Sequence, residues 1–151
     1  KTSVLYADGP RFRLGEADVL REGSDVTIVS CGLMVERAVA AAQVLENEGV
    51  EVRLLNMSTI RPLDTVSLDL AARETGGIVV AEEHLTRSGL GAMCAQALAT
   101  LEPVPMEFVG VENRYGESGT SMEVLDLMGL TSDRIIAAAH RVMDRKREAS
   151  G

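Results

Sequence analysis

The sequence predicts a three-layer α/β/α domain with a mostly parallel sheet, and three observations support this. Short Val/Ile-rich runs alternate along the chain with segments of helical periodicity. The runs are nearly continuous in apolar residues, as expected of strands that are covered on both faces. The chain has 151 residues, of which 46% are hydrophobic, and this is enough material for one globular domain. Each helix then returns the chain to a parallel neighbouring strand.

Four strands are predicted from the apolar runs. They are 26-VTIVSC-31, 50-VEVRLL-55, 77-GIVVA-81 and 106-MEFVGV-111. The region before them differs, because Gly9-Pro10 and Gly15 interrupt any regular pattern. We therefore expect residues 1–14 to form a connecting arm, followed by a short edge strand.

Helices are predicted where apolar residues recur at helical spacing. The first carries Val35, Ala38, Val39, Ala42 and Leu45, the second, weaker one Val66 and Leu70, and the third Leu90, Met93, Cys94, Ala97, Leu98 and Leu101. A capping box of Thr120 and Glu123 predicts a short helix. Ser132 then precedes a final helix with Ile135, Ile136, Ala139, Val142 and Met143. The domain is predicted over residues 15–147, with a frayed tail at 148–151.

Composition excludes several classes of function. The formal net charge of -8 leaves no basic surface for phosphate groups, so neither nucleic acid nor an anionic membrane is an expected partner. No apolar run approaches the roughly 20 residues of a membrane span, and the start of the chain lacks the apolar core of a signal peptide. The sequence thus predicts a cytoplasmic protein. Cys31 and Cys94 match no metal-ligand spacing and are predicted to be reduced packing residues.

The stretch 81-AEEHLTRSGLGAMCAQAL-98 contains the candidate site residues. They are Glu82, Glu83, His84, Arg87, Gly89 and Gly91. A helix start with free N–H groups favours an anion, although the two glutamates would oppose it. The favoured interpretation is that the glycines ease helix–sheet packing and that the segment is a subunit interface. His84 lies where a general base could act, but no nucleophile, metal partner or substrate pocket accompanies it in the sequence.

Other motifs are weaker. The turn 30–33 has one glycine where a dinucleotide-binding loop needs three, and His140 is predicted to lie at the edge of an apolar stripe. Asp25 stands at the start of its strand, which argues against a phosphoacceptor receiver domain. The turn Arg61-Pro62-Leu63-Asp64 is predicted to be structural, with Asp64 capping the next helix through Ser67 or Val66. A small-ligand module that uses the helix start at Gly89 stays open.

Three segments resemble the carboxyl-terminal domain of transketolase-like thiamin-diphosphate enzymes. They are residues 15–64, 80–98 and 116–142, nearly the whole chain. The turn 60-IRPLD-64 is shared with beta subunits of 2-oxoacid dehydrogenases and, loosely, with deoxyxylulose-phosphate synthases. The segment 80–98 and the motif Gly116-Glu117-Ser118-Gly119 are more similar to transketolase, particularly the form split into two chains. The resemblance implies a five-stranded mixed sheet in which one edge strand, within residues 12–20, runs antiparallel to the others.

The resemblance also implies which chemistry this chain lacks. In that family the first domain holds the diphosphate and magnesium, the second holds the aminopyrimidine, and the third is structural and contributes to dimer contacts. Here Ala7-Asp8-Gly9 lacks the leading glycine of the diphosphate motif, and residues 33–38 offer no asparagine. We therefore expect no catalytic, cofactor-binding or metal-binding residues in this chain.

The chain is then expected to be a piece of a larger enzyme. The parent would use thiamin diphosphate and magnesium to transfer two-carbon ketol units between sugar phosphates. The expected partners are the remaining transketolase domains or a partner subunit, in a homodimeric parent. The alternatives are the same domain of a 2-oxoacid dehydrogenase beta subunit or of a deoxyxylulose-phosphate synthase, and a stand-alone small-anion-binding α/β module.

Overall fold

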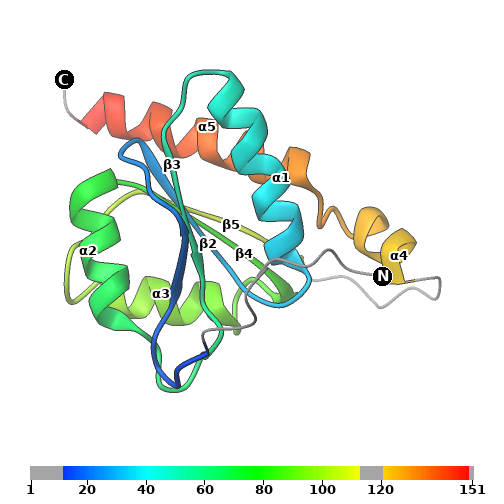
Figure 1. Ribbon diagram of the computed structural model, residues 1–151, viewed down its shortest axis with the longest axis horizontal. Helices are drawn as coiled ribbons and strands as arrows, with labels where there is room; N and C mark the ends of the chain where they lie inside the picture. The colour runs from blue at the N-terminus through cyan, green and yellow to red at the C-terminus, as the bar shows by residue number, and fades with distance from the viewer. Residues whose placement is uncertain (1–11, 113–120, 150–151) are drawn as a thin grey trace.

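The computed structural model describes residues 12–112 and 121–149, which form a sheet between two layers of helices (Figure 1). The strands are β1 (Asp18–Arg21), β2 (Val26–Ser30), β3 (Val52–Asn56), β4 (Ile78–Leu85) and β5 (Met106–Val111), in the spatial order β1-β3-β2-β4-β5. The β1 strand is antiparallel to β3, and the other pairs are parallel. The five-stranded mixed sheet and its antiparallel edge strand are thus confirmed, and β1 ends one residue beyond the expected range 12–20.

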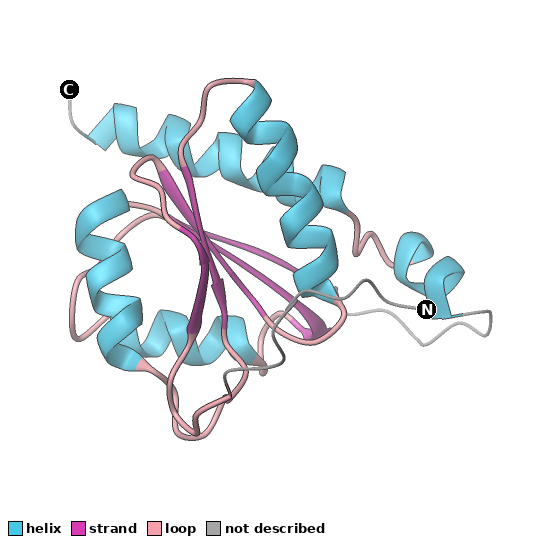
Figure 2. Ribbon diagram, viewed as in Figure 1, coloured by secondary structure: helices cyan, strands magenta, loops and turns pink. Residues whose placement is uncertain are grey.

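Most of the helices divide between the two faces of the sheet, as Figure 2 shows. They are α1 (Met34–Asn47), α2 (Thr65–Thr75), α3 (Leu90–Leu98), α4 (Ser121–Leu127) and α5 (Ser132–Ala149). The α1 and α5 helices cover one face and bury one apolar cluster against it, while α2 and α3 bury a second cluster on the other face. The predicted three-layer arrangement is therefore confirmed.

The β4 strand sends successive side chains to opposite faces, which determines where its polar end points. Val79 and Ala81 lie in the cluster under α1 and α5, whereas Ile78 and Val80 lie in the cluster under α2 and α3. Beyond Ala81 the register with β5 shifts, and β4 continues four residues past its predicted end. This bulged extension carries Glu82, Glu83 and His84 to the edge of the sheet where the parallel strands end.

The predicted apolar anchors of α2 are wrong. Val66 is 78% exposed and Leu70 is 52% exposed. The buried side of α2 consists instead of Leu68, Ala71, Ala72 and Thr75, spaced at i, i+3, i+4 and i+7. Alanine and threonine contribute little to a hydrophobic pattern, so the buried side of α2 is hard to recognise in the sequence. The larger apolar side chains of Val66 and Leu70 were therefore taken for the buried side.

The start of α5 is one residue earlier than predicted. The Thr131 hydroxyl oxygen accepts a hydrogen bond from the Arg134 N–H at 3.3 Å, so Thr131 caps this helix, where Ser132 had been expected to precede it. The helix then continues to Ala149, inside the stretch where the sequence predicted a frayed tail. The proposed cap at Thr120, the motif 116–119 and residues 7–9 lie outside the described residues.

Candidate functional site

A cleft opens at the edge of the sheet where the parallel strands end. The chain leaves β2 towards α1 on one face and leaves β4 towards α3 on the other, so this is the point at which open α/β sheets bind ligands. We call it the carboxyl-edge cleft, and its volume is about 330 Å³. Its lining residues are Cys31, Gly32, Ile60, Arg61, Glu82, Glu83, His84, Ser88, Gly89 and Met93.

Glu82 occupies the anion-binding start of α3 with its own carboxylate. Its side chain is buried, and its two oxygens accept the N–H groups of Leu90 at 2.6 Å and Gly91 at 2.8 Å. The N–H groups at the start of α3, which the sequence suggested could bind an external anion, are therefore already bonded to Glu82. A Cβ on Gly89 would overlap this carboxylate, so the glycine is required for the close approach.

Gly91 also lies in a confined space, as its predicted packing role requires. A Cβ at this position would lie 2.7 Å from Cδ1 of Phe108 and 3.3 Å from an oxygen of Glu82. Phe108 is 38% exposed, so its ring has room to turn away. The more restrictive of the two glycines is consequently Gly89, which the sequence interpretation had named together with Gly91.

Two further carboxylates mark the starts of α1 and α2. Glu83 accepts the N–H of Leu33 at 3.1 Å, at the beginning of α1. Asp64 accepts the N–H of Ser67 at 2.9 Å, which confirms its predicted cap of α2. Asp64 also accepts the N–H of Ala17 at 2.8 Å and so ties the β1 segment to this turn. All three crossover helices thus begin against a carboxylate, which complements the positive end of each helix dipole.

The surroundings shift the ionisation of three groups. Burial would raise the pKa of Asp64, but hydrogen bonds from the N–H groups of Ser67 and Ala17 and from the Ser67 hydroxyl outweigh it, so this pKa lies below its usual value. Burial, with Glu82 and then Glu83 adding to it, raises the pKa of Cys31 to about 11. Burial and Glu82 raise that of Cys94 to about 12. Both cysteines are free thiols, as predicted.

The structure brings together only some of the predicted site residues. Glu82, Glu83, His84 and Gly89 line the cleft, whereas Arg87 lines a smaller neighbouring hollow. His84 is exposed, and its Nδ1 lies 3.4 Å from the Leu85 carbonyl oxygen. Within the described chain no carboxylate orients this imidazole for proton transfer. Arg61 supplies the cation of the cleft instead, a role that sequence reasoning missed because it had assigned the residue to a structural turn.

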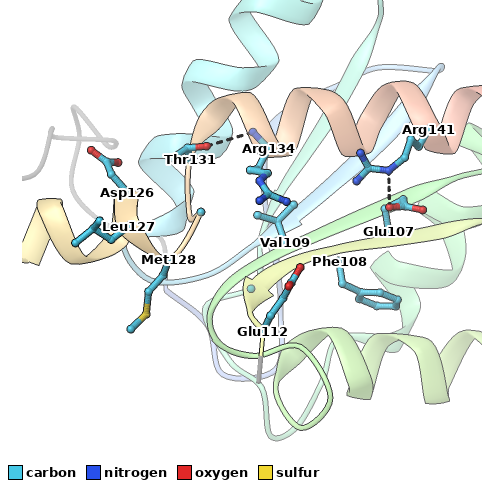
Figure 3. Close-up of a pocket in the computed structure, with 12 residues that line it drawn as sticks. Glu107, Phe108, Val109, Glu112, Asp126, Leu127, Met128, Thr131, Arg134 and Arg141 are labelled. Atoms are coloured by element: carbon cyan, nitrogen blue, oxygen red, sulfur yellow. Dashed lines mark hydrogen bonds and ion pairs between the residues drawn. The ribbon is translucent and has the colours of Figure 1, made fainter. Parts of the chain in front are cut away.

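A second groove, which the sequence did not indicate, lies between β5 and α5 (Figure 3). It has a volume of about 430 Å³, and Arg134 and Glu112 point into it from opposite sides. The Arg141 guanidinium bonds Glu107 at 2.9 Å, so part of its charge is paired. Both acidic and basic side chains line this groove, so it favours no single ligand charge.

Residues 12–112 and 121–149 hold no group of three or more His, Cys, Asp or Glu side chains that could bind a metal ion. None of the helices in the same ranges is long and apolar enough to cross a membrane.

Comparison with known proteins gives a consistent result. A family model described as the transketolase C-terminal domain matches residues 15–135. The chain is 39% identical to the 6-deoxy-6-sulfo-D-fructose transketolase subunit SqwH of a Clostridium species over 94% of this chain and 44% of that protein. It is 34% identical to the 1-deoxy-D-xylulose-5-phosphate synthase of Desulforudis audaxviator over 90% of this chain and 22% of that protein.

A solved structure is similar over nearly the whole fold. It is described as a split gene transketolase in an inactive beta4 tetramer, and it superposes with a TM-score of 0.91 at 39% identity. The match covers 96% of this chain and 48% of that chain. The present chain thus spans less than half the length of these relatives.

Proposed function

Since this chain belongs to the transketolase C-terminal domain family, we propose that it is the assembly domain of a transketolase-type enzyme. The parent would transfer two-carbon ketol units between sugar phosphates, with thiamin diphosphate and magnesium bound by its other domains. The similarity to a chain called a transketolase subunit supports this role, because that protein contains this domain within a longer chain. The fragment itself is proposed to be non-catalytic.

One observation carries the non-catalytic part of the proposal. At the carboxyl-edge cleft, Glu82 and Glu83 accept hydrogen bonds from the starts of α3 and α1. A diphosphate would need those N–H donors and would meet two carboxylates there. The cleft therefore does not fit the cofactor, and no step of the reaction is assigned to these residues.

Substrate choice is proposed to lie outside this domain. Two relatives that contain the same domain carry the names of different activities, one a 6-deoxy-6-sulfo-D-fructose transketolase and the other a 1-deoxy-D-xylulose-5-phosphate synthase. Because a fold of this kind is shared between reactions, function must be argued from the site that performs each one. The second name also keeps a deoxyxylulose-phosphate synthase parent as the alternative.

The proposed partners are the remaining transketolase domains, on the same chain or on a partner subunit, within a cytoplasmic homodimer. The structural relative is described as a split gene transketolase in an inactive beta4 tetramer, which supports a parent whose domains are divided between chains. Burial of apolar side chains at such contacts would be the main favourable contribution.

Titration and complementation test the proposal together. Calorimetric titration of this chain with thiamin diphosphate and Mg²⁺ should give no binding heat. Ketol transfer should be measurable when a separately expressed chain carrying the remaining domains is added, and neither chain should be active alone. Micromolar cofactor binding by this chain would contradict the proposal, and so would transfer activity that is independent of it. Formation of 1-deoxy-D-xylulose 5-phosphate by the pair would favour the alternative parent.

A further inference from the structure

The β5 strand lies at one end of the sheet, so one side of its backbone has no neighbouring strand. The carbonyl groups of Pro105 and Val111 accept N–H groups from the β4 side, at 3.0 Å and 3.2 Å. Main-chain groups of alternate residues face the same side of a strand. The N–H and C=O groups of Met106, Phe108 and Gly110 therefore face away from β4, along the open edge.

The beginning of this open edge is covered by a side chain of α5. The Arg145 guanidinium donates to the Met106 carbonyl oxygen at 2.9 Å, which is consistent with an outward-facing carbonyl. Among the described residues, no such group covers Phe108 or Gly110. The groove beside β5 is lined by the four consecutive residues 107–110. Because successive side chains point to opposite faces, a groove lined by all four runs along the backbone edge between those faces. An uncovered strand edge of this kind is a template for another strand.

The charges of this groove are only partly neutralised. Two ion pairs account for four of the charged residues in and beside it, and they are Arg141–Glu107 at 2.9 Å and Arg37–Asp126 at 2.8 Å. Arg134 and Glu112 are exposed and have no ion-pair partner among the described residues. Figure 3 shows these two side chains pointing into the groove from opposite sides. The groove therefore suits a ligand that carries both signs of charge.

The two faces of the β5 edge differ in polarity. Val109 belongs to the cluster under α1 and α5, and Figure 3 shows Arg134 beside it. The Phe108 ring is 38% exposed and lies on the α3 side, where a Cβ on Gly91 would be 2.7 Å from it. Directly opposite residues of paired strands point to the same face. An added strand would therefore place the residue opposite Val109 near Arg134, and its two neighbours on the side of the Phe108 ring.

We propose that the open edge of β5 binds an extended peptide segment of another protein as a sixth strand. The segment carries an acidic residue opposite Val109, where it pairs with Arg134, apolar residues on either side of it, and a basic residue opposite Glu112. Main-chain hydrogen bonds to Phe108 and Gly110 hold the peptide, and its alternate side chains give specificity. The groove shares no lining residue with the carboxyl-edge cleft, so the inference goes beyond the proposed function and does not depend on it.

A palindromic peptide tests the predicted side-chain pattern. Acetylated and amidated Lys-Thr-Val-Glu-Val-Thr-Lys presents the same order of side chains in a parallel and in an antiparallel pairing. Isothermal titration calorimetry with the wild-type chain should show saturable binding. The charge-reversed Glu-Thr-Val-Lys-Val-Thr-Glu should bind about tenfold or more weakly. Lys-Val-Thr-Glu-Thr-Val-Lys has the same composition and net charge as the first peptide, and it should also bind more weakly because its apolar side chains face α5.

Charge reversal on the protein tests the same contacts from the other side. The double variant Arg134→Glu/Glu112→Arg should prefer the charge-reversed peptide over the original one. Both side chains are exposed, so its melting temperature should stay close to that of the wild type. Arg147→Glu reverses an exposed charge on the same helix but outside the groove, and it should leave the wild-type preference unchanged.

Two further experiments test the main-chain hydrogen bonds. Phe108→Pro and Phe108→Ala both remove the ring, but only proline also removes the outward N–H, so Phe108→Pro should bind the peptide far more weakly. Since this N–H takes no part in the pairing with β4, proline is compatible with the strand. N-methylation of the peptide gives an answer that does not depend on the variant folding. An antiparallel peptide directs its two valine N–H groups to β5, whereas a parallel one directs its glutamate N–H there. N-methylation of one of these two sets, and not of the other, should abolish binding.

Several results would overturn the proposed peptide site. They are the absence of saturable binding up to about 1 mM peptide, equal binding of the original and charge-reversed peptides, a double variant that keeps the wild-type preference, and binding that survives both N-methylations. A dimer of the wild-type chain in sedimentation velocity that is lost in Phe108→Pro and kept in Phe108→Ala would assign the edge to a second copy instead. Ketol transfer with the complementary chain is measured separately, so a peptide that fails to bind would leave the proposed function standing.

Discussion

Charged side chains stabilise helix ends at both edges of the sheet, and their sign differs between the two edges. At the carboxyl edge, α1, α2 and α3 begin against Glu83, Asp64 and Glu82. At the amino edge, where α2 ends, the ammonium of Lys146 donates to the Thr75 carbonyl and, at 2.6 Å, to that of Asp25. Anions thus accompany helix starts and a cation accompanies a helix end, as the helix dipole favours.

The edges differ in what they leave exposed. At the amino edge, Arg53 forms ion pairs with Glu22 at 3.1 Å and with Glu74, so charges there are paired with one another. At the carboxyl edge, the carboxylates are directed at backbone N–H groups, while Arg61 and Ile60 stay exposed beside them. The exposed charges of the amino edge are therefore paired with one another, whereas the carboxyl edge leaves a cation and an apolar side chain exposed.

The largest expected effect on stability is that of Gly89→Val. A side chain at this position would displace the Glu82 carboxylate from the start of α3 and leave a buried acid without its donors. Overpacking and lost hydrogen bonds together should lower the free energy of unfolding by about 3 kcal/mol or more. Gly91→Val is the matched variant, and it should cost about 1–2 kcal/mol because the Phe108 ring can turn. The urea midpoints of the two variants measure both losses of stability. Equal losses would contradict the conclusion that Gly89 is the more confined glycine.

Glu82→Ala tests whether a buried carboxylate contributes more to the free energy of unfolding than an exposed carboxylate at the same edge. It leaves the N–H groups of Leu90 and Gly91 without their acceptor, and a loss of about 2 kcal/mol is expected. Glu83→Ala, which removes one bond at an exposed position, should cost about 0.5 kcal/mol. Thermal or chemical denaturation of the two variants gives the comparison. A larger loss for Glu83 would show that burial does not set the strength of these caps.

The fold could be predicted from the sequence further than the site could. Apolar runs and helical spacing located four strands and the main helices, because burial imposes its own period on each element. The capping role of Glu82 and Glu83 was missed, since Glu83 meets Leu33 from 50 residues away and only the order of the strands brings them together. The alternation of side chains along β4 was the available signal, because it sends two consecutive glutamates to two different helices.

Asp64→Ala should have a smaller effect than Glu82→Ala, with a distinct dependence on pH. The loss at pH 7 should be about 1 kcal/mol, as for other helix caps. Because the folded-state pKa of Asp64 is lowered, its stabilisation is complete above the unfolded value, about 3.9, and is lost as the pH falls through the folded value. Urea unfolding at pH 7 and pH 3 should therefore show a wild-type advantage that shrinks in acid. An advantage that grows in acid would contradict the direction of this shift.

The smallest expected effect is that of phosphate on the wild-type chain, which should be none. The donors that would hold the ion at the start of α3 are bonded to Glu82, and Arg87 does not line the cleft. A ligand at a hundred times its dissociation constant would add about 2.7 kcal/mol, a change that differential scanning calorimetry readily detects. Glu82→Ala frees the two donors, so millimolar phosphate should raise the melting temperature of that variant and leave the wild type unmoved. A wild-type rise that disappears in Arg87→Ala would instead support the small-anion-binding module and would show that the carboxyl edge is not closed to anions.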